Sequence, residues 1–149
     1  MSREAPTERA LTDAEHTEIA EAAQAALERF DLDPASDPAA LIAALESQIV
    51  ARRMVKGEHG ELVFEAGALF AHGLAGPLGW ELVELTWPAF SAVAAVTFDR
   101  SLVILPFLAV DRSLVPETPT DQLASTLRRL ADGERPPGLT RNGYAVLLP

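Results

Sequence analysis

The residue types that most often carry chemistry in proteins are sparse in this chain. There is no cysteine, and the three histidines stand at positions 16, 59 and 72. His72 lies two helical turns after Glu65 and three after Glu61, so the three side chains could share one helix face. A zinc site generally needs three or four convergent ligands, and its stronger helical signature places two histidines four residues apart. The spacing therefore favours an ordinary polar helix face over a metal site, and the sequence predicts no cofactor.

Neighbouring carboxylates are numerous, for example Glu81 with Glu84 and Asp111 with Glu117. Catalysis by such a pair requires surroundings that separate the two pKa values, and a sequence does not display them. The chain has no Gly-x-Ser-x-Gly turn, no phosphate-binding loop and no dinucleotide-binding fingerprint. No catalytic residue is predicted. A small enzyme with a carboxylate and histidine site remains the alternative function.

Two clusters of basic residues could bind an anion or an acidic partner, because arginine forks match carboxylates and phosphates. The clusters are Arg52, Arg53 and Lys56, and Arg128, Arg129 and Arg135. Both also fit the C-terminal end of a helix, where cations complement the helix dipole. Arg128 and Arg129 are kept as candidate interaction residues, together with Glu65 and His72.

Trp87 is the last candidate interaction residue, and it precedes a proline in a predicted loop. An exposed tryptophan there would mark a contact surface. Its large apolar area favours the other arrangement, in which the indole folds back over the edge of the sheet.

The charge balance narrows the class of partner. The chain carries 22 acidic and 12 basic residues, hence a net charge of −10, and residues 1–33 alone contribute −6 from nine acids and three arginines. Nucleic-acid binding relies on cations placed along phosphates, so no nucleic-acid partner is predicted. The acidity fits solubility alone, or steering toward a basic partner protein.

The length of 149 residues predicts one domain with one core. No stretch approaches the roughly 20 consecutive apolar residues of a membrane helix. Residues 1–10 are charged and lack the apolar segment of a secretory signal. We therefore expect a cytoplasmic protein with no membrane association.

Helix start signals organise the N-terminal part, after residues 1–11, which are expected to be a frayed lead-in. Thr12 with Glu15 forms a capping-box pattern, and an apolar stripe follows to Phe30. Asp37 before a proline predicts a second helix start. Whether residues 49–55 continue this helix or form a strand is left open by the sequence.

Residues 61–107 are expected to build the core of the fold. The pattern predicts a helix over 61–74, then strands over 80–85, 90–98 and 102–107. Gly67 and Ala71, one turn apart on this helix, would allow another element to approach closely. The short connections predict an antiparallel meander, whose third strand must end or run along an edge at Pro106.

A last helix is predicted after Thr118-Pro119, with Gly133 as its stop, and a last strand over 144–148. The expected fold class is α+β, with an antiparallel sheet of three to four strands and about four helices packed mainly on one face.

Several short motifs carry a family resemblance over the middle third of the chain. They are Ala66-Gly67-Ala68-Leu69-Phe70, Leu78-Gly79-Trp80, and Leu105-Pro106-Phe107 with Val110. This pattern resembles small bacterial α+β proteins in which a glycine-containing helix leads into a Gly-x-Trp strand and a meander that ends at Pro-Phe. The resemblance implies no activity and no functional residue. Some proteins of similar size and layout neutralise toxins or serve as accessory proteins in bacterial secretion or contact systems, an implication at the level of fold alone.

The missing motifs and the acidity together predict a non-catalytic protein-binding domain, for example a toxin-neutralising or adaptor protein, that presents an acidic surface. A homodimer with a structural purpose is a further alternative.

Overall fold

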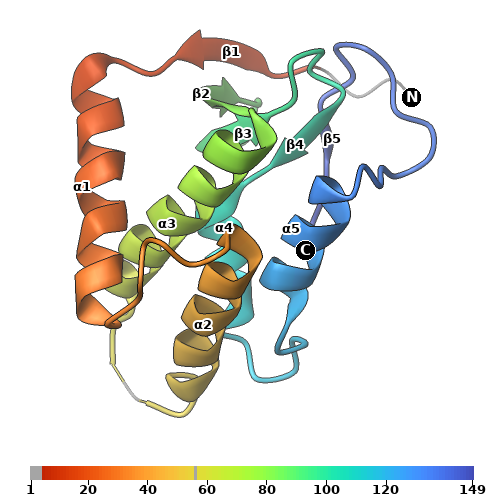
Figure 1. Ribbon diagram of the computed structural model, residues 1–149. Helices are drawn as coiled ribbons and strands as arrows, with labels where there is room; N and C mark the ends of the chain where they lie inside the picture. The colour runs from red at the N-terminus through yellow and green to blue at the C-terminus, as the bar shows by residue number, and fades with distance from the viewer. Residues whose placement is uncertain (1–4, 56) are drawn as a thin grey trace.

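The computed structural model describes residues 5–55 and 57–149 of the chain. In Figure 1 the helices lie in front of one sheet, with α1 at one side of the molecule and α5 at the other. The elements in chain order are β1 (Thr7–Ala10), α1 (Asp13–Arg29), α2 (Pro38–Ala51), α3 (Gly60–Leu78), β2 (Glu81–Thr86), β3 (Ser91–Val96), β4 (Leu102–Ile104), α4 (Pro106–Ser113), α5 (Gln122–Ala131) and β5 (Ala145–Val146).

The fold is α+β, as predicted, but the sheet is larger and of mixed direction. Its five strands follow the order β1-β2-β3-β4-β5. The meander β2-β3-β4 is antiparallel, as the short connections require, and Ala95 pairs with Ile104 in it. The expectation of an antiparallel sheet of three to four strands is therefore met only in part. β1 pairs with β2, and β5 pairs with β4 in parallel.

β1 corrects the expectation that residues 1–11 are only a frayed lead-in. Its four residues have no buried side chain, so the apolar alternation that reveals a strand is missing. The strand is instead defined by its register on β2, from Thr7 opposite Thr86 to Ala10 opposite Val83. Such backbone pairing leaves little trace in the sequence of an edge strand.

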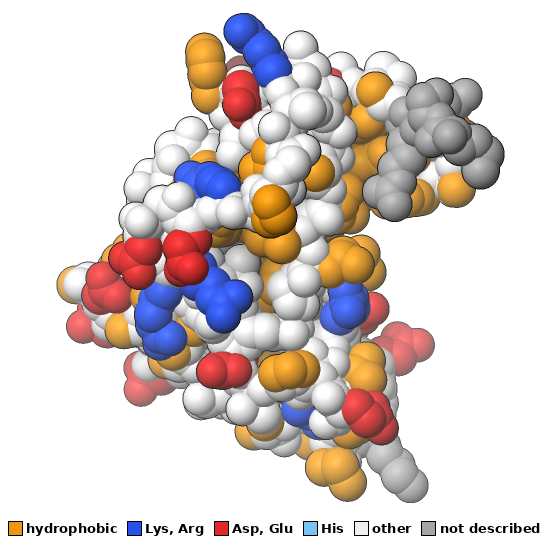
Figure 2. All heavy atoms as spheres, turned by 90° about the vertical axis from the view of Figure 1, so that its right-hand side faces the viewer, with side chains coloured by type: hydrophobic (Ala, Val, Ile, Leu, Met, Phe, Trp, Pro, Cys, Tyr) orange, Lys and Arg blue, Asp and Glu red, His pale blue; other side chains and the backbone are white. Residues whose placement is uncertain are grey.

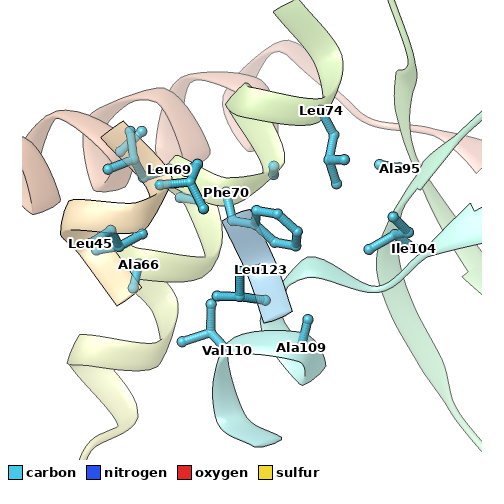
Figure 3. Close-up of a cluster of buried hydrophobic side chains, with 14 of the residues drawn as sticks. Leu45, Ala66, Leu69, Phe70, Leu74, Ala95, Ile104, Ala109, Val110 and Leu123 are labelled. Atoms are coloured by element: carbon cyan, nitrogen blue, oxygen red, sulfur yellow. The ribbon is translucent and has the colours of Figure 1, made fainter. Parts of the chain in front are cut away.

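The largest core cluster lies between the helices and the sheet, and α3 runs through its centre. Phe70 of α3 is fully buried, and Figure 3 shows its ring with Leu123 of α5 beside it and Ile104 of β4 across from it. A second, smaller cluster covers the opposite side of the sheet and draws no residue from a helix: Val83, Leu85, Ala94, Val96, Val103 and Leu105. The helices therefore pack on one face, as predicted, and β3 is covered on both faces.

The described residues form five helices where about four were expected, and the additional helix begins at Pro106. Pro106 has no backbone N–H group to donate to a neighbouring strand, so β4 ends before it, as predicted. The same residue takes the first position of α4. The apolar run over 102–107 therefore does not form one strand: residues 102–104 form β4, and Pro106 begins α4, a helix of eight residues.

Gly67 allows α4 to pack directly on α3. A Cβ atom built at this glycine would overlap Cδ1 of Phe107 and lie 3.1 Å from the Phe107 Cα atom. The ring of Phe107 also stacks on Phe64 of α3, with ring centroids 5.5 Å apart. The predicted close approach at Gly67 is thus confirmed, and α4 is the element that approaches.

Three of the four helix boundaries predicted from local signals are confirmed. Thr12 and Glu15 make the reciprocal capping box of α1, Asp37 accepts from the Ala40 N–H at 3.3 Å, and Gly133 follows α5 with a φ of +87°. The start signal at Thr118 is wrong, because α5 begins only at Gln122.

Residues 49–55 form no strand, and only the first three of them belong to a helix. α2 continues to Ala51, and turns follow it over 52–54. α3 extends past its expected end at Leu74 to Leu78, where Gly79 adopts a φ of +69° and stops it.

Candidate protein interface

The outer side of α1 carries a row of acidic side chains. The helix begins at its capping box and packs Ile19, Ala22, Ala23 and Ala26 against α3, so the residues in between face solvent. The exposed carboxylates on this outward side are Asp13, Glu18, Glu21 and Glu28. Among the residues that the structure describes, none of these four forms an ion pair. We call these four residues the acidic face of α1.

The two arginines nearest to this face are already bound to other carboxylates. Arg9 of β1 contacts Glu15 at 2.9 Å and Glu84 of β2 at 2.8 Å. The guanidinium of Arg9 and the backbone N–H of Thr12 together lower the pKa of Glu15 to about 2. Arg9 thereby ties the start of α1 to the sheet, and these two carboxylates occupy its guanidinium.

At the other end of α1, Arg29 is held by α3. Its Nε atom donates to Glu65 at 2.7 Å, and its Nη2 atom donates to Glu65 at 2.9 Å and to Glu61 at 3.0 Å. The Glu65 side chain is almost fully buried while Arg29 stays half-exposed. The bidentate contact fixes the geometry of this pair and occupies the Arg29 guanidinium.

A third arginine, Arg100, also binds two carboxylates and so links the edge strand β1 to the rest of the sheet. Arg100, in the β3–β4 turn, donates to both oxygens of Glu8 at 2.9 Å and to Glu81 at 2.5 Å. The Tyr144 hydroxyl also donates to Glu8, at 2.9 Å. These contacts join β1, the β3–β4 turn and the residue that precedes β5. The Arg100 guanidinium holds the pKa of Glu8 below its ordinary value.

The contact between Glu8 and Arg100 predicts that the protein loses stability in acid. Because the folded-state pKa of Glu8 is lowered, its contribution is present above the ordinary value of 4.5 and is lost as the pH falls through the folded value. Urea unfolding of wild type and Arg100→Gln across this range should give a flatter dependence of the unfolding free energy on pH in the variant. Arg112→Gln, at an exposed arginine of α4, is the control and should keep the wild-type slope. Equal slopes in Arg100→Gln and wild type would contradict the assignment.

Glu65 and His72 both lie on α3 beside α1, but they do not form one polar helix face, because Glu65 is buried and His72 is exposed. Glu65 is drawn into the pair with Arg29, whereas His72 lies near His16 of α1. Partial desolvation, and secondarily the neighbouring imidazole, lowers the pKa of His72. Within residues 5–55 and 57–149, no group of three or more histidine, aspartate or glutamate side chains is placed to hold a metal ion.

Trp87 folds back onto the sheet, as its apolar area favoured. The indole is half-buried, packs against the second core cluster and stacks on Phe90 with ring centroids 4.9 Å apart. Phe90 is half-exposed at this tip of the β2–β3 hairpin. The aromatic pair therefore covers the end of the sheet.

The basic residues that follow α2 serve structural contacts. Arg53 donates to the carbonyl oxygens of Ser113, Pro116 and Pro119, at 2.8 to 3.3 Å, and so holds the segment between α4 and α5. The Arg52 guanidinium lies 4.9 Å from the centre of the Phe30 ring. Lys56, the third member of that cluster, lies outside the described residues.

Arg128 and Arg129 are both exposed in the last turn of α5, as predicted, but their surroundings differ. Arg129 lines a groove between α5 and the C-terminal residues 147–149, and Arg128 does not. Arg135 donates to the carbonyl oxygens of Leu130 and Glu134 and is therefore occupied at the end of the helix.

Glu46 is a structural residue that the sequence reading missed. It is 1% exposed on α2, and its two carboxylate oxygens accept the backbone N–H groups of Leu123 at 2.8 Å and Ala124 at 3.2 Å. It thus caps α5 from another helix. Burial raises the pKa of Glu46, and the two backbone donors oppose that shift. The signal was present in its spacing, since Glu46 occupies a core position in the same stripe as Ile42 and Ile49.

Comparison with protein-family models, with curated proteins and with solved structures finds no match to this chain. The resemblance of its middle third to small bacterial α+β proteins therefore stays a prediction. In the part of the chain that the structure describes, the helices are too short or too polar for any of them to span a membrane.

Proposed function

We propose that this protein is a non-catalytic binding domain that engages a basic partner protein through the acidic face of α1. One observation carries the proposal: the four outward carboxylates have no ion pair among the described residues, while Arg9 and Arg29 are each already bound to two other carboxylates. The negative charge of the face is therefore left for another molecule.

The negative charges of the acidic face slightly destabilise the isolated protein and favour its association with a basic partner. Glu18 and Glu21, which lie three residues apart on the helix, repel each other by roughly 0.2–0.5 kcal/mol. A partner with complementary positive charge would remove this repulsion and would be steered toward the face over about one Debye length. A second copy of the chain would bring the same negative charge, so a homodimer through this face is disfavoured.

A toxin-neutralising protein and an adaptor are the two concrete versions of this function. Either version is helped by a rigid presentation of the face, because α1 packs on α3 and arginine pairs hold both of its ends. The helix would then need little further ordering when a partner binds, so the entropic cost of binding would be smaller than for a flexible surface.

The test compares two variants of equal charge. In the α1-neutral variant, Glu18→Gln, Glu21→Gln and Glu28→Gln remove three charges from the acidic face. In the control variant, Asp111→Asn, Glu117→Gln and Asp132→Asn remove three exposed charges elsewhere. Each changes the net charge from −10 to −7.

Proteins captured by the immobilised domain from its source cells should include a basic partner that wild type and the control variant retain equally. The α1-neutral variant should retain about tenfold less of it, the equivalent of about 1.4 kcal/mol. An equal loss of retention in the two variants would show that general acidity, and no particular face, is responsible, and equal retention by all three proteins would show that these charges play no part. A capture that does not distinguish the α1-neutral variant from wild type therefore contradicts the proposal.

A further inference from the structure

The groove beside α5 lies on the opposite side of the molecule from α1 (Figure 1) and has no part in the function proposed above. Its volume is about 430 Å³, and it opens between α5 and the C-terminal residues 147–149. Leu130, Leu147 and Leu148 supply apolar surface, and Ser125, Thr126 and Arg129 supply polar groups. Figure 2, which faces this side of the molecule, shows apolar side chains down the middle with basic and acidic side chains beside them.

The strand next to this groove presents an unprotected sheet edge. β5 is the last strand in the sheet order, and its neighbour is β4 alone. Ala145 donates its N–H to Ser101 at 3.1 Å and Leu147 donates to Val103 at 2.8 Å. Successive residues of a strand direct their backbone groups to opposite sides, so the N–H and C=O groups of Val146 face away from β4. No backbone group of the described residues pairs with them, so another extended chain could do so.

The two edges of the sheet differ in chemistry. β1 carries Glu8 and Arg9, and charged side chains discourage further pairing at an edge. β5 has no charged residue, and Val146 and Leu148 expose 36% and 55% of their surface. An exposed apolar edge strand is a template for strand addition.

Two polar groups of the groove are available to a ligand. The side-chain Nε2 atom of Gln122 is buried, and among the described residues it has no hydrogen-bond partner. A buried donor without a partner costs free energy that a new acceptor would recover. Arg129 lines the groove, is exposed and forms no ion pair within the described part of the chain. An incoming carboxylate would match its guanidinium fork.

We propose that the outer edge of β5 and the groove beside α5 bind an extended segment of a partner protein, with a carboxylate of that segment at Arg129. The segment adds to the sheet as a strand through the backbone groups of Val146. Its alternate apolar side chains lie on Leu130 and Leu148 in the groove, and one of its carbonyl groups accepts from Gln122. Main-chain pairing supplies affinity, and the groove and Arg129 supply selectivity.

The probe is a phage-displayed library of short random peptides, selected on the full chain. Enriched peptides should alternate apolar and polar residues and carry an acidic residue. Val146→Pro removes the one outward N–H group and spares the donors that pair with β4, so it should weaken the selected peptides about tenfold or more. Arg129→Ala should weaken them by a similar factor.

Two matched controls keep the test specific. Val146→Ala retains the outward N–H group, and Arg128→Ala removes the neighbouring arginine that does not line the groove. Both should bind the selected peptides within about twofold of wild type, which corresponds to about 0.4 kcal/mol. The circular dichroism spectrum and melting temperature of each variant report whether it has folded.

A failure to enrich any peptide, or enriched peptides that bind all four variants like wild type, overturns the proposal. So does a dimer in sedimentation that Val146→Pro abolishes, because a second copy of the chain would then occupy the edge. The α1-neutral variant should bind the selected peptides normally, so this proposal and the proposed function can fail separately.

Discussion

Replacement of Gly67 by alanine is expected to lower the free energy of unfolding by about 2 kcal/mol, although alanine is the better helix former. The new methyl group would overlap the Phe107 ring and press on the Phe107 backbone, which α4 cannot move without leaving α3. Overpacking of this kind exceeds the roughly 1 kcal/mol that alanine gains over glycine inside a helix. Urea unfolding followed by circular dichroism measures the difference.

Gly73 offers a matched control on the same helix. A Cβ atom there would lie 3.6 Å from the nearest atoms of Ile42, which is an ordinary van der Waals distance. Gly73→Ala should therefore be neutral or should stabilise the protein by up to about 1 kcal/mol. Opposite signs for the two glycines are the expected result. A Gly67→Ala variant as stable as Gly73→Ala would show that α4 does not pack on α3 at Gly67.

Glu46→Ala is expected to lower the free energy of unfolding by about 3 kcal/mol. The substitution leaves the N–H groups of Leu123 and Ala124 without their acceptor in the interior, at a cost of about 1–3 kcal/mol for each buried group. It also removes the only side-chain cap that the described residues give to the start of α5. Equilibrium unfolding measures the loss, and hydrogen exchange should locate it as weaker protection along α5.

The Glu46→Gln variant distinguishes the contribution of the hydrogen bonds to stability from the contribution of the carboxylate charge. The amide oxygen can still accept one of the two N–H groups, so this variant should lose less stability than Glu46→Ala. Because burial raises the folded-state pKa of Glu46, a proton on it stabilises the fold below 4.5, and that contribution is lost as the pH rises through the folded value. Glu46→Gln should lack this dependence. An alanine variant that unfolds like wild type would contradict the capping role.

The elements that the sequence predicted correctly are those whose signals are local. The capping box at Thr12, the cap-then-proline start at Asp37, the break at Pro106 and the stop at Gly133 each depend on a few adjacent residues. The signal at Thr118-Pro119 failed for a long-range reason: the cap of α5 comes from Glu46, 77 residues before Leu123 in the chain.

The edge strands of the sheet were harder to predict, because backbone hydrogen bonds define them and an apolar side-chain pattern does not. β1 has no buried side chain, and β5 is two residues long, so neither has the apolar pattern of the central strands. The parallel direction of β5 follows from the long connection through α4 and α5, which carries the chain back to the starting end of β4.

The candidate surface was only partly predictable. The acidity of the N-terminal residues is visible in the sequence, and the helical period places the carboxylates of α1 outward. The roles of Arg9 and Arg29 were not visible, because their partners Glu84 and Glu65 lie far away in the chain. Those contacts decide which carboxylates are neutralised and which stay free, and the proposed function depends on that difference.

The most direct test of the proposed function is the salt dependence of binding to a captured partner. The dissociation constants for wild type and the α1-neutral variant would be measured by titration calorimetry between about 50 and 500 mM sodium chloride. Wild-type binding should weaken steeply with salt, and the α1-neutral variant should bind more weakly at low salt and change little. Equal affinities for the two proteins at every salt concentration would contradict the assignment of the acidic face of α1 as the binding surface.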